Sequence, residues 1–351
     1  MKKFLKVLLW VLVAIVAIAA LFFAYLTIRE YNPGPVVAAE VRGTASGERV
    51  PAGEDVTVVS WNVGYCGLGK ECDFVMDGGG NAPVPDEAQV RRYIDGVNAS
   101  LNEANADIYM LQEVDERSSR TYKIDERDYF TRGMDAIGYN YVCDFVPFPW
   151  PPIATIKSGV LTTTGYEIES ADRHSLPCPF SWPLKIANLK RCLLVSRLPV
   201  EGSDKEFVVV NFHLEAYDSG EGKIAQTRQL MEFIQSEYEK GNYVIAGGDW
   251  NQVFPGSLDV YPNNHPDLWA VGTVEESMLP SGWALAYDLT TPTCRLLNQP
   301  YNPADTANTQ YYVIDGFIVS PNVELKSVAT LDKEFENSDH NPVKMVISLA
   351  Q

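Results

Sequence analysis

The chain has 351 residues and a formal net charge of −18, and apolar residues make up 46% of it. This length and composition allow a sizeable hydrophobic core and exclude a disordered chain. The acidic balance argues against a static nucleic-acid coat protein, because such proteins neutralise phosphates with a basic surface. An enzyme that handles phosphate through a metal stays compatible with it, since the cation supplies the positive field.

The first segment of the chain has the composition of a membrane anchor. Lys2, Lys3 and Lys6 precede an uncharged apolar run from Val7 to Leu26. A run of about 20 residues spans a hydrocarbon core of roughly 30 Å, and the lysines belong on the cytoplasmic side. We therefore expect residues 1–30 to comprise the cytoplasmic lysines and the transmembrane anchor of a single-pass cell membrane protein, with the rest extracytoplasmic. A cleaved signal peptide is the alternative, although its apolar region is usually shorter and ends at small residues.

The segment after the anchor is expected to be a linker. Residues 31–54 contain Pro33, Pro35 and Pro51 and show little periodicity, which is typical of a stalk. We expect residues 55–351 to form one catalytic domain.

The cysteines do not form a recognisable framework. Six are present and none forms a CxxC pair, so structural zinc is not indicated. Outside the cytoplasm one or two disulfides are permitted. Buried free thiols and a small loop closed by Cys66 and Cys72 both stay open.

Short runs of β-branched and aromatic residues recur along the remaining chain and predict strands. They cover Val56–Trp61, Ile108–Leu111, Phe207–Phe212, Tyr243–Ala246, Tyr311–Val319 and Val343–Leu349. Helical spacing appears in two segments, with Val90, Ile94, Val97 and Leu101 after Asp86, and with Ile224, Met231, Ile234 and Tyr238 before Lys240 and Gly241. This mixture predicts an α/β sandwich.

Polar side chains that can bind metal or transfer protons stand where these strands begin or end. They are Asn62, Glu113, His213, Asp249 with Asn251, Asp315, and Asp339 with His340. Each alone has an ordinary explanation as a turn residue, a solvated charge or a structural histidine. Strand ends in a sandwich converge on one edge, however, and two of only four histidines are in the set. Together they predict one site.

The order and local sequence of these segments resemble the endonuclease/exonuclease/phosphatase superfamily, which includes DNase I-like nucleases, abasic-site endonucleases, sphingomyelinases and inositol-phosphate phosphatases. The matching segments are Ser60-Trp61-Asn62, Leu111-Gln112-Glu113-Val114, Asn211-Phe212-His213-Leu214, Gly247-Gly248-Asp249-Trp250-Asn251, Ile314-Asp315-Gly316-Phe317 and Ser338-Asp339-His340-Asn341-Pro342. The resemblance implies a four-layer α/β sandwich, with two central mixed β-sheets flanked by helices. It also implies a divalent cation, usually Mg²⁺, with Mn²⁺ as the alternative.

The resemblance also implies a metal site and its ligands. Glu113 would be the principal ligand, with Asn62 and Asp339 nearby. These are the hard oxygen donors that Mg²⁺ prefers. The cation would polarise the phosphoryl group and offset charge on the leaving oxygen.

Catalytic roles follow from the same resemblance. Asp249, beside Asn251, would orient or deprotonate the attacking water. His340 would contact the phosphate, with Asp315 fixing its tautomer and favouring its cationic form. His213 would stabilise the pentacovalent state or assist the leaving group.

Three loop features bear on the substrate. Some abasic-site endonucleases carry an Asp two residues after the first Asn, where this chain has Gly64, which weakens the case for that repair activity. The Gly- and Asp-rich segment Tyr65–Asn81 is either a wall of the cleft or a surface loop. The loop Phe145–Pro152 carries Phe148 and Trp150, which either meet a lipid or sugar or pack inside.

These observations lead us to expect a metal-dependent phosphoesterase acting on a phosphodiester or phosphomonoester, with a small or lipid-linked substrate. An extracellular nuclease is the first alternative, although the acidic charge does not favour nucleic acid. Its candidate phosphate contacts are Arg117, Arg120, Lys157, Lys190 and Arg191. A catalytically silent binding module of the same fold is the second alternative, disfavoured because no acid, amide or histidine position is replaced. No GxSxG elbow indicates a serine hydrolase.

Overall fold

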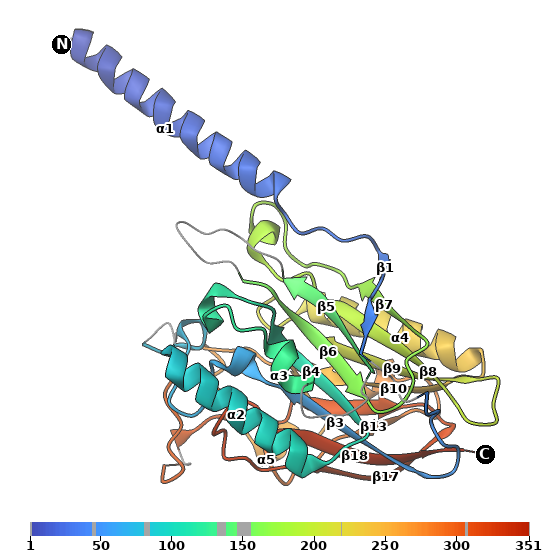
Figure 1. Cartoon of the computed structure of the whole chain (residues 1–351). Helices are drawn as coiled ribbons and strands as arrows, with labels where there is room; N and C mark the ends of the chain where they lie inside the picture. Colours follow the sequence, from blue (N-terminus) through green and yellow to red (C-terminus); the bar gives the residue numbers. More distant parts are fainter. Residues whose placement is uncertain are drawn as a thin grey trace.

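The computed structural model describes residues 2–43, 47–80, 85–131, 138–145, 156–218, 220–305 and 308–350. Within them, two seven-stranded sheets form the centre of the molecule, and helix α1 projects away from this body (Figure 1). Sheet I has the order β1 (Val36–Ala38), β7 (Ser170–Ser175), β8 (Cys192–Pro199), β9 (Glu206–His213), β10 (Tyr243–Asp249), β16 (Asp315–Val319) and β13 (Ala284–Ala286). Sheet II has the order β17 (Val323–Thr330), β18 (Val343–Leu349), β3 (Asp55–Asn62), β4 (Ile108–Asp115), β6 (Ser158–Thr164), β5 (Gly138–Phe145) and β2 (Val41–Arg42).

The remaining elements are shorter or lie outside the sheets. Two small ribbons pair β11 (Gln252–Val253) with β12 (Gly272–Thr273) and β14 (Cys294–Arg295) with β15 (Tyr311–Tyr312). The α-helices are α1 (Lys2–Ile28), α2 (Glu87–Ala104), α3 (Glu126–Thr131), α4 (Glu221–Glu239) and α5 (Ser257–Val260). The 3₁₀ turns are η1 (Gly64–Cys66), η2 (Val75–Asp77), η3 (Ser119–Thr121), η4 (Leu184–Ala187) and η5 (Glu276–Met278).

Alternation along the strands explains why the two sheets stack. Val56 and Val58 of β3 and Val209 of β9 belong to one buried cluster between the sheets. Residues one position away point to the opposite face, because side chains alternate along a strand. Val59 on β3 packs against α2, and Val208 on β9 packs against α4. Each sheet therefore has a core on both faces, as a four-layer sandwich requires.

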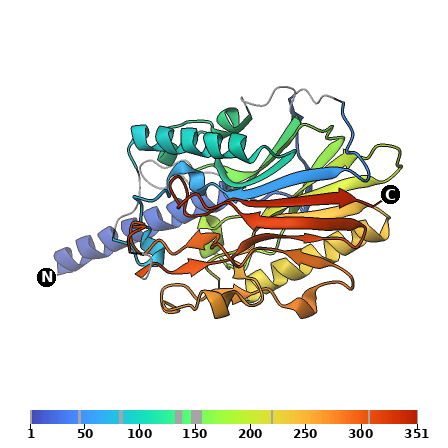
Figure 2. The same ribbon diagram turned by 90° about the horizontal axis from the view of Figure 1, so that it is seen from below.

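The two outer layers are helical. Helix α2 begins after Asp86, whose side chain accepts a hydrogen bond from the Gln89 amide at 2.8 Å, and it covers sheet II. Helix α4 covers sheet I, and Figure 2 shows the two helices on opposite sides of the stacked sheets. The expected four-layer fold and both expected helices are confirmed. One detail differs, because Ile224 was expected on the buried face of α4 and is exposed.

Helix α1 is apolar after the lysines of its first turns. An 18-residue window within it has a mean hydropathy of 3.0, and none of that window is buried in the body. By length and composition it is able to cross a membrane, and a signal sequence near an N-terminus has the same properties.

The segment expected to be a linker is partly built into the sheets. β1 pairs with β7 at the edge of sheet I, and β2 pairs with β5 at the edge of sheet II. Val50 is fully buried in the core between the sheets. The physical reason is that edge strands carry unpaired backbone groups, which a β-branched segment such as Val36–Ala38 can satisfy.

The single strand expected over Tyr311–Val319 is wrong. β15 belongs to a small ribbon and β16 to sheet I. Between them the chain turns, and the Thr293 hydroxyl accepts hydrogen bonds from the Ile314 and Asp315 amides at 2.9 and 3.1 Å. These two amides therefore donate to a side chain and not to a neighbouring strand, at the point where the chain passes from the small ribbon to sheet I.

The cysteines are free thiols where the structure describes them. Cys66 and Cys72 are both buried and unbridged, so a disulfide between them is excluded. Cys72 lies 3.8 Å from the Tyr93 hydroxyl. The side chain of Cys143 and the expected aromatic loop with Phe148 and Trp150 lie outside the described residues.

Candidate active site

Three neighbouring strands of sheet I carry polar side chains in register at one edge of the sheet, where β9 and β10 end and β16 begins. His213 on β9 lies directly opposite Asp249 on β10, and Asp249 lies opposite Asp315 on β16. All three follow the alternation that also puts Val209 and Phe317 between the sheets. They therefore form a row on the inner face of sheet I, at one edge of the sandwich.

Asn62 links this row to sheet II. It follows the same alternation as Val58 on β3, so its side chain faces sheet I. Its amide nitrogen donates to Glu113 Oε1 at 3.1 Å and to Asp249 Oδ2 at 3.0 Å, and its Oδ1 accepts from the Gly64 amide at 3.0 Å. Asn62 thus holds one carboxylate from each sheet.

Glu113 reaches the site because its strand is irregular. Simple alternation would put it on the α2 side with Leu111, which packs in that outer core. The pairing of β4 with β6 shifts between Leu111 and Val114, and Glu113 has a φ of +54°. A bulge with a left-handed residue redirects a side chain and costs roughly 1–3 kcal/mol of backbone strain. Such strain persists where the surrounding structure holds it, and functional sites are the usual place.

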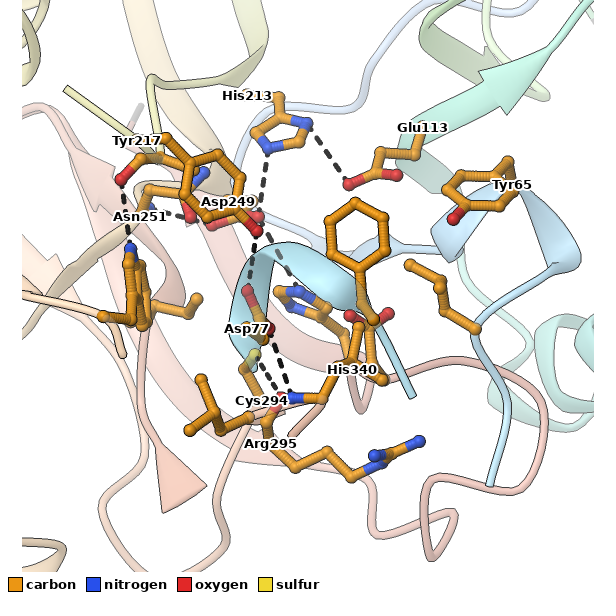
Figure 3. A pocket seen from close by; sticks show the side chains of 18 of the residues that line it. Tyr65, Asp77, Glu113, His213, Tyr217, Asp249, Asn251, Cys294, Arg295 and His340 are labelled. Carbon is orange, nitrogen blue, oxygen red and sulfur yellow. Dashed lines mark hydrogen bonds and ion pairs between the residues drawn. The ribbon is translucent and has the colours of Figure 1, made fainter. Parts of the chain in front are cut away.

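The strand ends open into a cleft of about 270 Å³. Six of the eight site residues expected from sequence line it, namely Glu113, His213, Asp249, Asn251, Asp339 and His340. Asn62 and Asp315 are not among the lining residues, but Asn62 hydrogen bonds to Glu113 and Asp249, and Asp315 hydrogen bonds to His340. All eight are therefore brought together, and Figure 3 shows Glu113, His213, Asp249 and His340 around the cavity.

His340 and Asp315 form a buried hydrogen-bonded pair. Nδ1 of His340 lies 2.8 Å from Asp315 Oδ2, and its Nε2 lies 3.8 Å from Asp249 Oδ2. Burial disfavours the imidazolium, but the Asp315 carboxylate, together with the nearby Cys294 and Asp339, outweighs this effect and raises the pKa of His340 well above its usual value. The ring is therefore a cation at neutral pH.

This pair also bears on where a metal could bind. Potential ligand atoms of Asp249, Asp315 and His340 lie within 4.8 Å of one another. A protonated imidazole has no lone pair for a metal, and Nδ1 is already bound to Asp315. We therefore interpret this group as a histidine–carboxylate pair and not as a metal centre.

His213 has the opposite protonation state. Its Nε2 lies 3.3 Å from Asp249 Oδ2 and its Nδ1 lies 3.9 Å from Glu113 Oε1. Burial lowers its pKa well below the usual value, with the Arg191 and His340 charges adding to the shift. Nδ1 has no hydrogen-bond partner among the described residues. A neutral ring therefore faces the cleft with an unused nitrogen.

The negative charges of the carboxylates at the cleft floor are only partly balanced by nearby positive charges. Burial raises the pKa of Asp339 to about 7, with the charge of Glu113 adding to the shift and His340 opposing it. Burial, followed by the charge of Asp315, raises the pKa of Asp249 to about 6. Glu113 and Asp339 offer hard carboxylate oxygens, and Asn62 lies beside them with its amide nitrogen on Glu113, so this set of residues fits a divalent cation.

Some lining residues have no signal in the sequence. Asp77 accepts a hydrogen bond from the Tyr217 hydroxyl at 2.8 Å (Figure 3), and with Tyr65 and Phe74 it makes the Gly- and Asp-rich segment a wall of the cleft. Arg295, 1% exposed, donates to the carbonyls of Gly69 and Cys72 at 2.9 and 3.2 Å. Only the folded chain reveals this buried arginine as the support of that wall.

Two of the five basic candidates line the cleft, and three do not. Arg120 and Arg191 line it, whereas Arg117, Lys157 and Lys190 are not among its lining residues. The Arg120 guanidinium donates to both Asp115 oxygens, at 2.9 and 2.7 Å, and lies 3.4 Å above the Tyr65 ring centre. It is therefore held rigidly at the rim.

Replacing Gly64 with alanine is expected to lower activity about a hundredfold, because misplacing a reacting group by about 1 Å has this effect. An added Cβ would lie 2.8 Å from Asp339 Oδ1, and the φ of Gly64 is +54°. Steady-state kinetics and Mg²⁺ titration would measure the effect. Gly202→Ala is the control, since its φ is +69° and no atom lies within 4 Å of its added Cβ. Equal turnover and equal Mg²⁺ affinity of the two variants would contradict the expected clash with Asp339.

Comparison with known proteins agrees with this geometry. The family model described as "Endonuclease/Exonuclease/phosphatase family" matches residues 59–340. No curated protein matches the sequence. Among solved structures, an endonuclease/exonuclease/phosphatase from Beutenbergia cavernae aligns with a TM-score of 0.56 and 16% identity, covering 84% of this chain and 72% of that one.

Two further structures share the fold at similar distance. ANGEL2, a 2′,3′-cyclic phosphatase in complex with adenosine-2′,3′-vanadate, gives a TM-score of 0.55 and 16% identity, covering 90% of this chain and 99% of that one. Truncated TDP2 from Caenorhabditis elegans gives a TM-score of 0.52 and 15% identity, covering 85% of this chain and 99% of that one. The chain therefore belongs to the endonuclease/exonuclease/phosphatase family, whose members act on phosphoester bonds and generally depend on a divalent metal.

Proposed function

We propose that the protein is a Mg²⁺-dependent phosphoesterase, anchored in the cell membrane by α1, with its cleft on the extracytoplasmic side. One observation carries the proposal. The row His213, Asp249 and Asp315 on sheet I lies at the same edge of the sandwich as the carboxylate of Glu113 on sheet II. The lysines in the first turns of α1 support the orientation, because such residues stay cytoplasmic.

The metal site in this proposal consists of Glu113, Asn62 and Asp339. These residues would hold the cation, and its positive charge would stabilise the phosphoryl oxygens and the leaving oxygen. Asn62 holds Glu113 in place through its amide hydrogen bond. Mn²⁺ has the same preference for oxygen ligands and is the alternative ion.

Asp249 is proposed to orient the attacking water and accept its proton. The Asn251 amide donates to Asp249 Oδ1 at 2.8 Å, and the Asn251 side chain donates to the Leu214 carbonyl at 2.9 Å. A carboxylate with a pKa near 6 is a suitable proton acceptor around neutral pH. The water oxygen bonds to phosphorus, the ester P–O bond breaks, and the leaving oxygen receives a proton.

The two histidines have separate roles in this mechanism. His340, kept cationic by Asp315, binds a non-bridging phosphoryl oxygen and stabilises the charge that builds up in the transition state. His213 is neutral and presents its unused Nδ1 to the phosphoryl group or to the leaving oxygen.

A nuclease is the less favoured alternative. A track for a nucleic-acid backbone needs available lysine and arginine side chains. Here Arg120 pairs with Asp115, Lys157 pairs with Glu116, and Lys190 pairs with Glu30. The basic candidates therefore have acidic partners, and a small or lipid-linked phosphate fits the cleft better.

The test is hydrolysis by the full chain in detergent. Plasmid DNA, sphingomyelin, inositol phosphates and bis-p-nitrophenyl phosphate would be compared with Mg²⁺, Mn²⁺ and EDTA, beside His340→Ala. We expect turnover that EDTA abolishes and the variant lacks. Turnover resistant to EDTA would contradict metal dependence. A folded protein without turnover and without Mg²⁺ binding would be a binding module instead.

A further inference from the structure

The segment between β7 and β8, residues 176–191, contacts the end of α1. The Trp182 indole donates to the Thr27 hydroxyl at 3.0 Å, and the rings of Trp182 and Phe23 meet edge to face with centres 5.9 Å apart. Figure 1 shows this β7–β8 segment beside the end of α1 nearest the body. The segment therefore lies at the level where the chain leaves the helix.

Ion pairs fix this contact just beyond the helix. Glu30 follows the end of α1, and its carboxylate pairs with Lys190 at 3.1 Å and with Lys185 at 3.7 Å. Leu26 is the buried residue of α1, so the last turns of the helix pack against the body. Charged pairs belong in the head-group region and not in hydrocarbon, which puts the β7–β8 segment at the membrane–water boundary.

Two large apolar side chains of this segment face outward. Trp182 is 54% exposed and Leu184 is 63% exposed. Helix α1 has 27 residues, and its apolar run Val7–Leu26 already matches a hydrocarbon core of about 30 Å, so Thr27 and Ile28 lie at the boundary of that core. Tryptophan is enriched at this interface because its ring is apolar and its N–H is polar. An interfacial location would cover both side chains.

The same segment forms part of the cleft wall. Leu189 and Arg191 line the cleft. Arg191 also lines a second cavity of about 150 Å³, together with Glu30 and Pro33 at the exit of α1. The cleft and the cavity at the exit of the anchor therefore share Arg191 as a lining residue, which brings the cleft close to the expected bilayer surface.

The cleft is also suited to an apolar substrate portion. Beside the acidic and histidine groups, its lining includes Leu68, Phe74, Trp269, Leu296 and Leu297. Such a lining can take the first methylene groups of a chain whose phosphate reaches the polar floor.

We propose that the β7–β8 segment rests in the bilayer interface and presents the cleft to it, so that the substrate is a phosphate ester carried by a membrane lipid. This inference rests on the proposed phosphoesterase function. Water adds to the lipid phosphorus, one P–O bond to an alcohol breaks, and that alcohol leaves with a proton. The lipid chains stay in the membrane throughout.

The first experiment uses the full chain in phosphatidylcholine nanodiscs containing phosphatidic acid, a monoester, or phosphatidylglycerol, a diester. Water-soluble bis-p-nitrophenyl phosphate is the reference substrate. The double variant Trp182→Ser/Leu184→Ser is expected to lose about tenfold in kcat/KM on one of the lipids, since it loses the burial of two large apolar side chains, and to keep its rate on the soluble ester. The control is Leu258→Ser/Val260→Ser, because these exposed residues lie on α5, far from α1 (Figure 1).

A second readout does not depend on turnover. Brominated lipids quench nearby tryptophan, so quenching should be stronger in the natural chain than in Trp182→Phe. Equal quenching in the natural chain and in Trp182→Phe would overturn the membrane contact. So would a double variant whose kcat/KM falls equally on lipid and soluble esters, or falls on neither. Hydrolysis of the soluble ester without hydrolysis of either lipid would overturn the substrate class. Absence of all hydrolysis would contradict the proposed function, while the quenching result would still decide whether Trp182 meets the bilayer.

Discussion

Replacing Glu113 with glutamine is expected to lower phosphoester turnover about a thousandfold while leaving the protein folded. Glutamine keeps the shape of the side chain and its hydrogen bond to Asn62, but it removes one negative charge from the proposed metal site. Divalent cations such as Mg²⁺ bind mainly through carboxylates. Loss of one preorganised charge-stabilising group typically lowers kcat by a factor of about 10²–10³. The loss should appear in both metal affinity and kcat.

Steady-state kinetics and calorimetric Mg²⁺ titration would measure these two effects separately. Glu116→Gln is a suitable control, because Glu116 lies three positions further along the same segment, pairs with Arg127 at 2.9 Å and does not line the cleft. A Glu113→Gln protein with full turnover would exclude Glu113 from the site. Complete loss of turnover with unchanged Mg²⁺ affinity would show that Glu113 is not a ligand of the metal.

The convergence of the site could be predicted because its residues follow simple strand geometry. His213, Asp249 and Asn62 continue the alternation of buried apolar residues on their strands, so a reader of the sequence can assign them to the inner face. Their strands are neighbours or face each other, and the pattern of polar strand ends therefore marked one edge of the sandwich.

Glu113 shows where this logic stops. Its position on the strand predicts the wrong face, and only the bulge after Leu111 aims it at the cleft. Nothing in the local sequence indicates a bulge, since no glycine stands at the left-handed position. The segment Tyr65–Asn81 posed a similar problem, because its position depends on the distant Arg295.

Several strands were missed for physical reasons that can be named. β6 is Ser-Gly-Val-Leu-Thr-Thr-Thr and is buried along its whole length, so it lacks the alternation of a half-exposed strand. β1 and β2 are short edge strands whose pairing is decided by neighbours far away in sequence. β17 does alternate for part of its length, and a closer count of its pattern would have found it.

The last prediction concerns Asp315 and His340, which should behave as one unit. Asp315→Asn and His340→Gln are each expected to lower kcat about a thousandfold, and the double variant should be no worse than the poorer single variant. The reason is that Asp315 hydrogen bonds to His340 at 2.8 Å and acts mainly by setting the tautomer and charge of that ring. Catalytic groups that work together are strongly non-additive in this way. Losses that multiply would show that the two residues act independently.

The pH profile tests the charge of His340 in the same set of proteins. Activity that needs the imidazolium is present below the pKa of His340 and is lost as the pH rises through it. Asp315 raises that pKa, whereas burial opposes the charge, so removing the carboxylate lowers it. The alkaline limb of kcat should therefore move to lower pH in Asp315→Asn, and it should stay in place in the control His265→Gln, whose side chain is outside the cleft. An alkaline limb unchanged in Asp315→Asn would mean that His340 acts as a neutral ring, and the phosphate contact would then need another cation.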